Sequence, residues 1–162
     1  FKEMECKVSL CDPRDSLPSQ SSLSYPMDVR FPFENVERSL FGKVYRPIAL
    51  VSLKTLRKNT WISTWMVVDT GADFTILPRY LSEDLGVSLE RDCIKDTTTG
   101  VGGDQTIYLC KSKIKAKIGL FKRDVPLAFL DSNEVPALLG RLGFLETFDT
   151  EFLKTHVVVF KD

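Results

Sequence analysis

Residues 66–73 read Met-Val-Val-Asp-Thr-Gly-Ala-Asp, and most of what the sequence says about fold and function starts from them. Asp69 directly follows an apolar run that is typical of a buried strand, and Gly71 can turn the chain sharply just after it. The Asp-Thr-Gly triplet is weakly diagnostic alone, because an aspartate in such a turn often only accepts hydrogen bonds from the backbone amides that follow. Whether the triplet marks an active site therefore depends on the surrounding segments.

Short apolar runs on both sides of this segment predict a mainly β fold. Residues 47–53 and 61–68 predict one hairpin, and residues 93–99 and 106–110 predict a second hairpin around the glycine-rich run 100–104. Residues 111–118 alternate apolar and lysine side chains, as a half-buried strand requires. The other predicted elements are a strand at 74–77, helical turns at 79–85, a strand at 123–130, a buried run at 135–139, a helix at 140–148 and a closing strand at 156–160. Together they predict a small closed β-barrel with one short C-terminal helix.

Three motifs in a fixed order resemble the retropepsin-like (retroviral-type) aspartic proteases. The first is the hydrophobic-hydrophobic-Asp-Thr-Gly-Ala-Asp run that ends at Asp73, which is similar to the family's active-site loop. The glycine-rich run 100–103 resembles the tip of the flap, and the segment Ala-Leu-Leu-Gly-Arg that ends at Arg141 resembles the start of the family's C-terminal helix. The resemblance covers about residues 46–160, and residues 1–45 lie outside it.

The resemblance implies an aspartic endopeptidase, with roles for particular residues. Catalysis would rest on Asp69, Thr70 and Gly71, and an ion pair between Asp73 and Arg141 would tie the loop to the helix. Thr70 would brace two such loops across a two-fold axis. The substrate-binding and flap residues would be Ala72, Asp73, Gly100, Val101, Gly102 and Gly103. No metal or organic cofactor is implied, since water is the nucleophile.

The chain contains only one Asp-Thr-Gly triplet. Hydrolysis of a peptide bond by carboxylic acids needs two of them close together, one ionised and one protonated. The other candidates, at Asp96, Asp131 and Asp149, lack the following glycine. We therefore expect a homodimer, because an isologous interface brings Asp69 of both copies to the two-fold axis.

Some residues depart from the viral members of the family. Leu142 follows Gly140-Arg141, where viral enzymes carry Asp or Asn. The run 140–144 and the Arg46-Pro47 start resemble bacterial and other non-viral single-domain members more closely. The polar N-terminal region leaves open whether the family's dimer interface, which interleaves terminal strands, applies here.

Length and composition fit one globular domain. The chain has 162 residues, 22 basic and 22 acidic side chains and a net charge of zero. We expect a polar extension at 1–26, a lead-in segment at 27–45 and the protease domain at 46–162. The four cysteines fit reduced thiols, and His156 fits a strand residue better than a ligand. The sequence shows no membrane span and no signal peptide, which favours a cytoplasmic protein without a membrane partner.

Two other functions compete with a peptidase that acts on a peptide or protein substrate. A non-catalytic peptide-binding or assembly module could keep the same fold and groove. Its weakness is that a pure binder gains nothing from two carboxylates that repel each other across an axis. Nucleic-acid binding is supported only by Lys111, Lys113, Lys115 and Lys117, and the neutral net charge argues against it.

Overall fold

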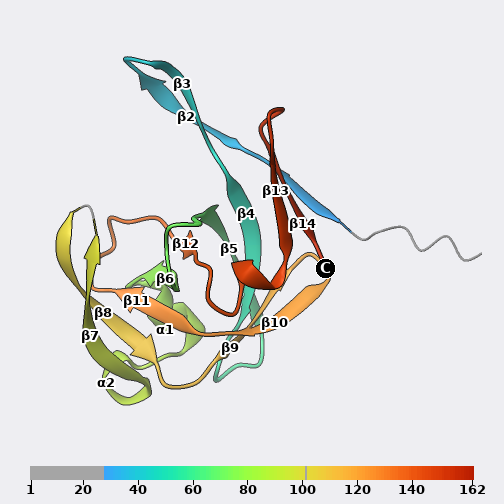
Figure 1. Cartoon of the computed structure of the whole chain (residues 1–162). Coiled ribbons are helices and arrows are strands. Elements are labelled where there is room, and N and C mark those ends of the chain that lie inside the picture. The colour runs from blue at the N-terminus through green and yellow to red at the C-terminus, as the bar shows by residue number, and fades with distance from the viewer. Residues whose placement is uncertain (1–27, 101) are drawn as a thin grey trace, which may run out of the picture.

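The computed structural model describes residues 28–100 and 102–162, and the fold is mainly β (Figure 1). Two helices of one turn each, α1 (Leu81–Leu85) and α2 (Leu89–Asp92), and one short 3-10 helix, η1 (Leu145–Thr147), interrupt the strands. The strands are β1 (Val29–Pro32), β2 (Glu34–Ser39), β3 (Gly42–Arg46), β4 (Ile48–Lys54), β5 (Trp61–Val68), β6 (Thr75–Pro78), β7 (Cys93–Gly100), β8 (Gly103–Cys110), β9 (Ile114–Ile118), β10 (Phe121–Val125), β11 (Leu127–Leu130), β12 (Leu138–Leu139), β13 (Asp149–Leu153) and β14 (Val157–Lys161). No helix in this part of the chain is long and apolar enough to cross a membrane.

Nine strands form the main sheet, in the order β10-β9-β4-β5-β12-β6-β11-β8-β7. The short strand β12 is parallel to β5 and antiparallel to β6, so it lies between the strands on either side of the Asp69 loop. A second sheet contains β1, β14 and β13, and a third contains only β2 and β3. The main sheet is an open half-barrel rather than the closed barrel that the sequence predicts. Its end strands, β10 and β7, are paired with their hairpin neighbours β9 and β8 instead of with each other.

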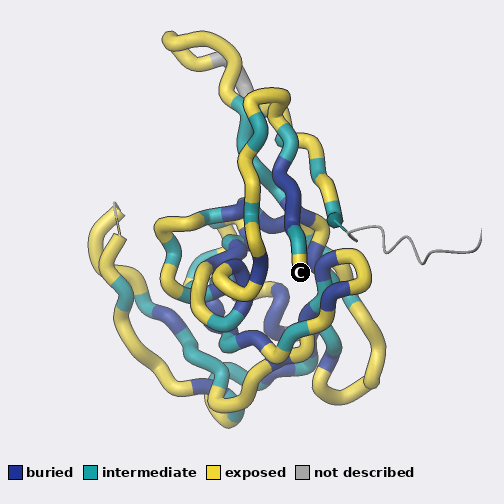
Figure 2. The backbone as a smooth tube through the Cα atoms, turned by 45° about the vertical axis from the view of Figure 1, so that its right-hand side comes forward, coloured by how far each residue is buried: buried dark blue, intermediate teal, exposed yellow. Residues whose placement is uncertain are grey.

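The alternating patterns bury one face of the sheet. In β9 the side chains of Ile114, Ala116 and Ile118 are buried while Lys115 and Lys117 point outward, as predicted. The core continues through buried residues of β4, β5, β11 and β14, including Phe129 and Phe160. Figure 2 shows these buried segments gathered in the body of the molecule.

Both predicted hairpins are confirmed. Strands β4 and β5 pair from Ile48 opposite Val67 to Lys54 opposite Trp61, and β7 pairs with β8 along its whole length. The single strand predicted at 123–130 is wrong. It divides into β10 and β11 at Pro126, which has no N–H to donate, and the two parts pair with different strands.

The helix predicted at 140–148 is wrong: this segment forms turns and the three-residue helix η1. Gly143 adopts a φ of 64°, which lies in the left-handed region and ends any right-handed helix there. The N–H of Leu145 donates to the carbonyl of Gly140, and the N–H of Thr147 donates to the carbonyl of Phe144. The backbone donors are thus satisfied without a regular helix.

Residues before position 46 contribute strands that the sequence does not predict. β1 pairs with β14, with Val29 opposite Phe160, so part of the predicted lead-in segment lies within the second sheet. β13 is also additional, and His156 lies in the turn before β14 with a φ of 58° rather than in a strand. The predicted extension at 1–26 lies outside the described residues.

Candidate active site

The Asp69 loop begins where β5 ends, between β12 and the start of β4. The N–H of Val68 donates to the carbonyl of Pro47 (2.9 Å), and the N–H of Asp69 donates to the carbonyl of Leu139 (3.1 Å). Val68 is buried and Asp69 is half-buried. The loop therefore starts from a fixed backbone and presents its carboxylate at the boundary between core and solvent.

A local hydrogen bond orients the Asp69 carboxylate. The N–H of Gly71 donates to Asp69 Oδ1 at 2.9 Å, and the N–H of Ala72 donates to the Asp69 carbonyl at 3.3 Å. A Cβ atom at position 71 would lie 3.2 Å from the same Oδ1, a tight contact. Glycine at 71 thus lets the chain turn closely around the carboxylate. Thr70, the next residue, is exposed.

Backbone hydrogen bonds from the segment after β12 hold the Asp69 loop in place. The N–H of Arg141 donates to the carbonyl of Ala72 at 2.9 Å, and the N–H of Leu142 donates to the carbonyl of Asp73 at 2.8 Å. Gly140 packs directly against the chain at Phe74, because a Cβ atom at 140 would lie 2.0 Å from the Phe74 carbonyl oxygen. The first and third sequence motifs therefore meet in the structure.

The side chains of Asp73 and Arg141 form an ion pair between Oδ1 and Nη2. Both side chains are largely exposed, at 70% and 53% respectively. Water screens such a pair, and exposed pairs contribute only about 0–1 kcal/mol to stability. The loop is therefore held mainly by its backbone hydrogen bonds, and the ion pair adds to them at the surface.

A groove of about 520 Å³ lies between the Asp69 loop and the tip of the β7–β8 hairpin. Asp69, Gly71, Ala72 and Asp73 line one side, and residues 98–100, Gly102, Gly103 and Gln105 line the other. Gly103 has a φ of 90°, which favours glycine at this position of the tip. Val101, the remaining predicted flap residue, lies outside the described residues. The first two motifs thus face each other across one groove.

The sequence did not predict the apolar wall of this groove. Its residues are Phe74, Ile76, Leu130, Val135, Pro136 and Leu138. They come from β6 and the residue before it, from β11, and from β12 and the segment before it, which are neighbours only in the folded chain. The one signal in the sequence is the apolar run 135–139, which predicts a buried segment. Within it Ala137 and Leu139 are buried, whereas Val135 and Leu138 are half-buried at the groove.

The other features singled out in the sequence lie away from this groove. The Sγ atoms of Cys93 and Cys110 are 3.7 Å apart at the base of the β7–β8 hairpin, as free thiols. Burial is the main cause that raises the pKa of each thiol, strongly so for Cys110. The His156 ring stacks on Tyr45 with centroids 3.9 Å apart. Among the described residues no group of three acidic, histidine or cysteine side chains is placed to hold a metal ion.

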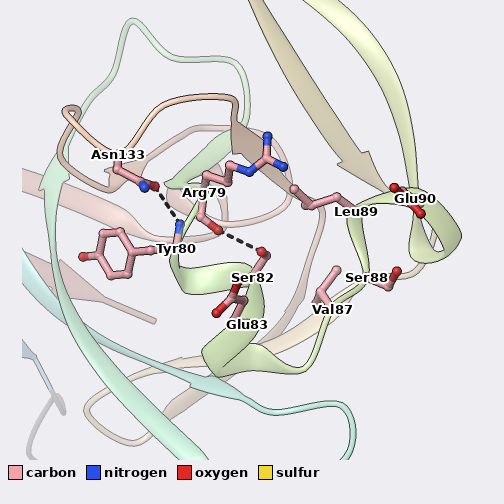
Figure 3. A pocket seen from close by; sticks show the side chains of 9 residues that line it. All are labelled: Arg79, Tyr80, Ser82, Glu83, Val87, Ser88, Leu89, Glu90 and Asn133. Atoms are coloured by element: carbon pink, nitrogen blue, oxygen red, sulfur yellow. Dashed lines mark hydrogen bonds between the residues drawn. The ribbon is translucent and has the colours of Figure 1, made fainter.

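A separate polar cavity of about 360 Å³ lies at helix α1 (Figure 3). The N–H of Tyr80 donates to Asn133 Oδ1 at 2.9 Å, and the Ser82 hydroxyl donates to the Arg79 carbonyl at 2.8 Å. The first bond connects the start of α1 to the loop after β11, and the second is local to the start of the helix. Asp69 does not line this cavity, so its polar groups stabilise local structure rather than extend the groove.

Comparison with known proteins agrees with this geometry. A family model described as "Aspartyl protease" matches residues 59–142, which include the Asp69 loop, the β7–β8 tip and Arg141. The crystal structure of a retropepsin-like aspartic protease from Rickettsia conorii is similar, with a TM-score of 0.54 and 17% sequence identity over 82% of this chain and 97% of that chain. None of the curated proteins matches the sequence. The family model and the structural similarity agree on one fold.

Proposed function

The chain belongs to the aspartyl proteases with a retropepsin-like fold, and on this premise we propose that two copies form a homodimer that hydrolyses peptide bonds between their two Asp69 carboxyls. The observation that carries the proposal is the position of the chain's one Asp-Thr-Gly triplet. Its aspartate lines a groove of about 520 Å³ opposite a glycine-rich hairpin tip. A single copy supplies only half of the required pair of carboxyls.

In the dimer the two Asp69 side chains share one proton. Two carboxyl groups within hydrogen-bond distance repel each other when both are ionised, so one stays protonated. The ionised carboxylate accepts a proton from a water molecule as the water oxygen bonds to the peptide carbonyl carbon. The protonated carboxyl donates a hydrogen bond to the carbonyl oxygen, where negative charge develops. The carbon–nitrogen bond then breaks, and the leaving nitrogen takes up a proton from the pair.

Neighbouring residues prepare this arrangement. The Gly71 N–H donates to Asp69 Oδ1. We assign contact with the partner and the water to the second carboxylate oxygen. Thr70 forms hydrogen bonds across the axis with the partner's loop. Ala72 and Asp73 line the groove where the peptide backbone passes. Their role is to position the substrate beside the paired carboxyls.

The β7–β8 tip acts as the flap. Gly100, Gly102 and Gly103, together with Val101, allow the tip to approach a peptide backbone closely and to open for substrate and product. A Cβ atom at position 100, 102 or 103 would meet no other atom within 4 Å, so the tip is not packed against the body. Closure over the groove removes water from the reacting bond.

The test uses purified full-length protein and a peptide library between pH 4 and 7, with product identification by mass spectrometry. Asp69→Asn is expected to lower kcat/KM by about 10² to 10⁴-fold, because the amide can neither accept nor donate the catalytic proton. Asp84→Asn, at an exposed position of helix α1, is the matched control and should retain activity. Cleavage that survives Asp69→Asn unchanged would contradict the proposal.

A further inference from the structure

The β2–β3 hairpin, residues 34–46, is the least supported element of the described chain, and we call it the arm. Its strands pair only with each other, from Glu34 opposite Arg46 to Ser39 opposite Gly42. Figure 1 shows it projecting from the body, and Figure 2 shows most of its length exposed. Isolated two-stranded hairpins are marginally stable in water. An arm of this kind therefore gains most of its stability from whatever it contacts.

The tip of the arm is apolar. Leu40 and Phe41 are fully exposed, at 102% and 100%, and Val44 is 44% exposed. The turn is built to present them. The Ser39 hydroxyl oxygen accepts from the Phe41 N–H at 3.1 Å, and Gly42 supplies a φ of 111°. Single exposed apolar residues are common, but two complete apolar side chains at the end of a projecting element are typical of an interaction surface.

The base of the arm is fixed beside the Asp69 loop. The arm ends at Arg46, and the next residue, Pro47, accepts the hydrogen bond from Val68, whose neighbour is Asp69. Tyr45 stacks on His156, and Phe33 lies 5.9 Å from the same imidazole ring. These aromatic contacts hold the arm to the β13–β14 turn. The arm consequently leaves the body at the end of β5 where the catalytic loop begins.

We infer that the arm of each copy packs its Leu40–Phe41 tip on the second copy and is part of the dimer interface. The inference rests on the proposed function, because only a second copy completes the site. The two-fold axis must pass between the two Asp69 loops, so the partner lies against the end of the body from which the arm rises. Strand residues of the arm add about 3.3 Å each, which carries the tip well past that end. By symmetry the partner's arm contacts this copy in the same way.

The first experiment measures the dimer dissociation constant of the full chain by sedimentation equilibrium and its peptidase activity over the same protein concentrations. Leu40→Asp with Phe41→Asp is expected to raise the dissociation constant at least about tenfold, because buried apolar anchors dominate interface energies. Activity should fall at low protein concentration and recover at high concentration as the dimer reforms. Leu120→Asp is the matched control, an equally non-conservative change at a 73% exposed residue in the β9–β10 turn.

A photo-crosslinking residue provides the second readout and does not depend on a destabilising substitution. Benzoylphenylalanine at position 41 should form a covalent dimer on irradiation, and at position 120 it should not. An unchanged dissociation constant together with no crosslink overturns the inference. The inference is also overturned if the wild type binds anionic lipid vesicles and Leu40→Asp with Phe41→Asp abolishes that binding without any change in dimerisation. A wild type that dimerises through the arm but cleaves no peptide would instead contradict the proposed function alone.

Discussion

The arm and the β7–β8 hairpin are both glycine-turned antiparallel hairpins, but they are held to the molecule in opposite ways. In β7–β8, one strand also pairs with β11, and the hairpin buries Cys93 and Ile107 against the body. Its tip is rich in glycine, with Thr98, Thr99 and Asp104 beside it. The arm pairs with no other strand in the described part of the chain, and its tip is apolar. The proposed flap must release substrate and product in each cycle, so weak contacts suit it. The proposed arm interface is lasting, and its apolar side chains are tolerated because the second copy covers them.

The largest expected difference between the hairpins is in folding stability. Ile107 in β8 is 2% exposed, and Ile107→Ala should lower the free energy of unfolding by about 2–5 kcal/mol because it leaves a cavity. Val44→Ala in the arm should change it by no more than about 0.5 kcal/mol. Urea denaturation, at a protein concentration low enough to keep the chain monomeric, measures both. A comparable loss in Val44→Ala would mean that the arm is packed within its own chain.

The sequence predicts the β7–β8 hairpin and the Asp69 loop because their signals are local. Glycines at 100, 102 and 103 lie between two strand-like runs, and Asp69 directly follows a β-branched strand. The arm has no such signal: Val36 and Val44 are its only β-branched residues, and polar residues separate them from the tip. Its pairing is visible only in the folded chain. The helix predicted at 140–148 agrees with the resemblance of the Ala-Leu-Leu-Gly-Arg segment to the start of the family's C-terminal helix, and the left-handed backbone conformation at Gly143 excludes it.

The apolar wall of the groove and the open main sheet could not be predicted because they depend on contacts between segments that are distant in sequence. Ile76 and Leu138 are far apart in sequence and become neighbours because β12 inserts between β5 and β6. That insertion involves only two residues, Leu138 and Leu139, too few to give a periodic pattern. Pairings between distant segments depend on the whole topology, whereas turns and alternation depend on nearby residues.

Thiol groups at the bases of the two hairpins should be alkylated at different rates, an effect of intermediate size. Cys93 and Cys110 face each other at the base of β7–β8, and burial raises the pKa of both thiols above the ordinary value. The thiolate is the reactive form, so a raised pKa keeps these residues protonated and slow to alkylate. Asn35→Cys places an exposed thiol near the base of the arm. At pH 8 it should react with iodoacetamide at least about tenfold faster than either native thiol.

The pH dependence of the alkylation rate should also differ between the exposed and the buried thiols. Between pH 7 and 9 the rate at Asn35→Cys should rise as an ordinary thiol, with a pKa of about 8.5, ionises. The rate at Cys110 should stay low over the same range, because its pKa lies higher. Mass spectrometry of proteolytic peptides separates these positions from Cys6 and Cys11. Rapid labelling of Cys93 or Cys110 in the native protein would show that the base of the β7–β8 hairpin opens easily.

The smallest expected effect concerns the ion pair between Asp73 and Arg141. If backbone pairing and apolar burial hold projecting segments in this fold, removal of an exposed charge pair should matter little. Arg141→Ala keeps the backbone N–H that donates to the Ala72 carbonyl, and it removes only a side chain that is 53% exposed. The free energy of unfolding should fall by less than about 1 kcal/mol. The difference from wild type should shrink further in about 1 M salt, where the Debye length is about 3 Å. A larger, salt-independent loss of unfolding free energy in urea denaturation would mean that the guanidinium itself holds the Asp69 loop. Side-chain charge would then be a third means, beside backbone pairing and apolar burial, by which this fold holds its projecting segments.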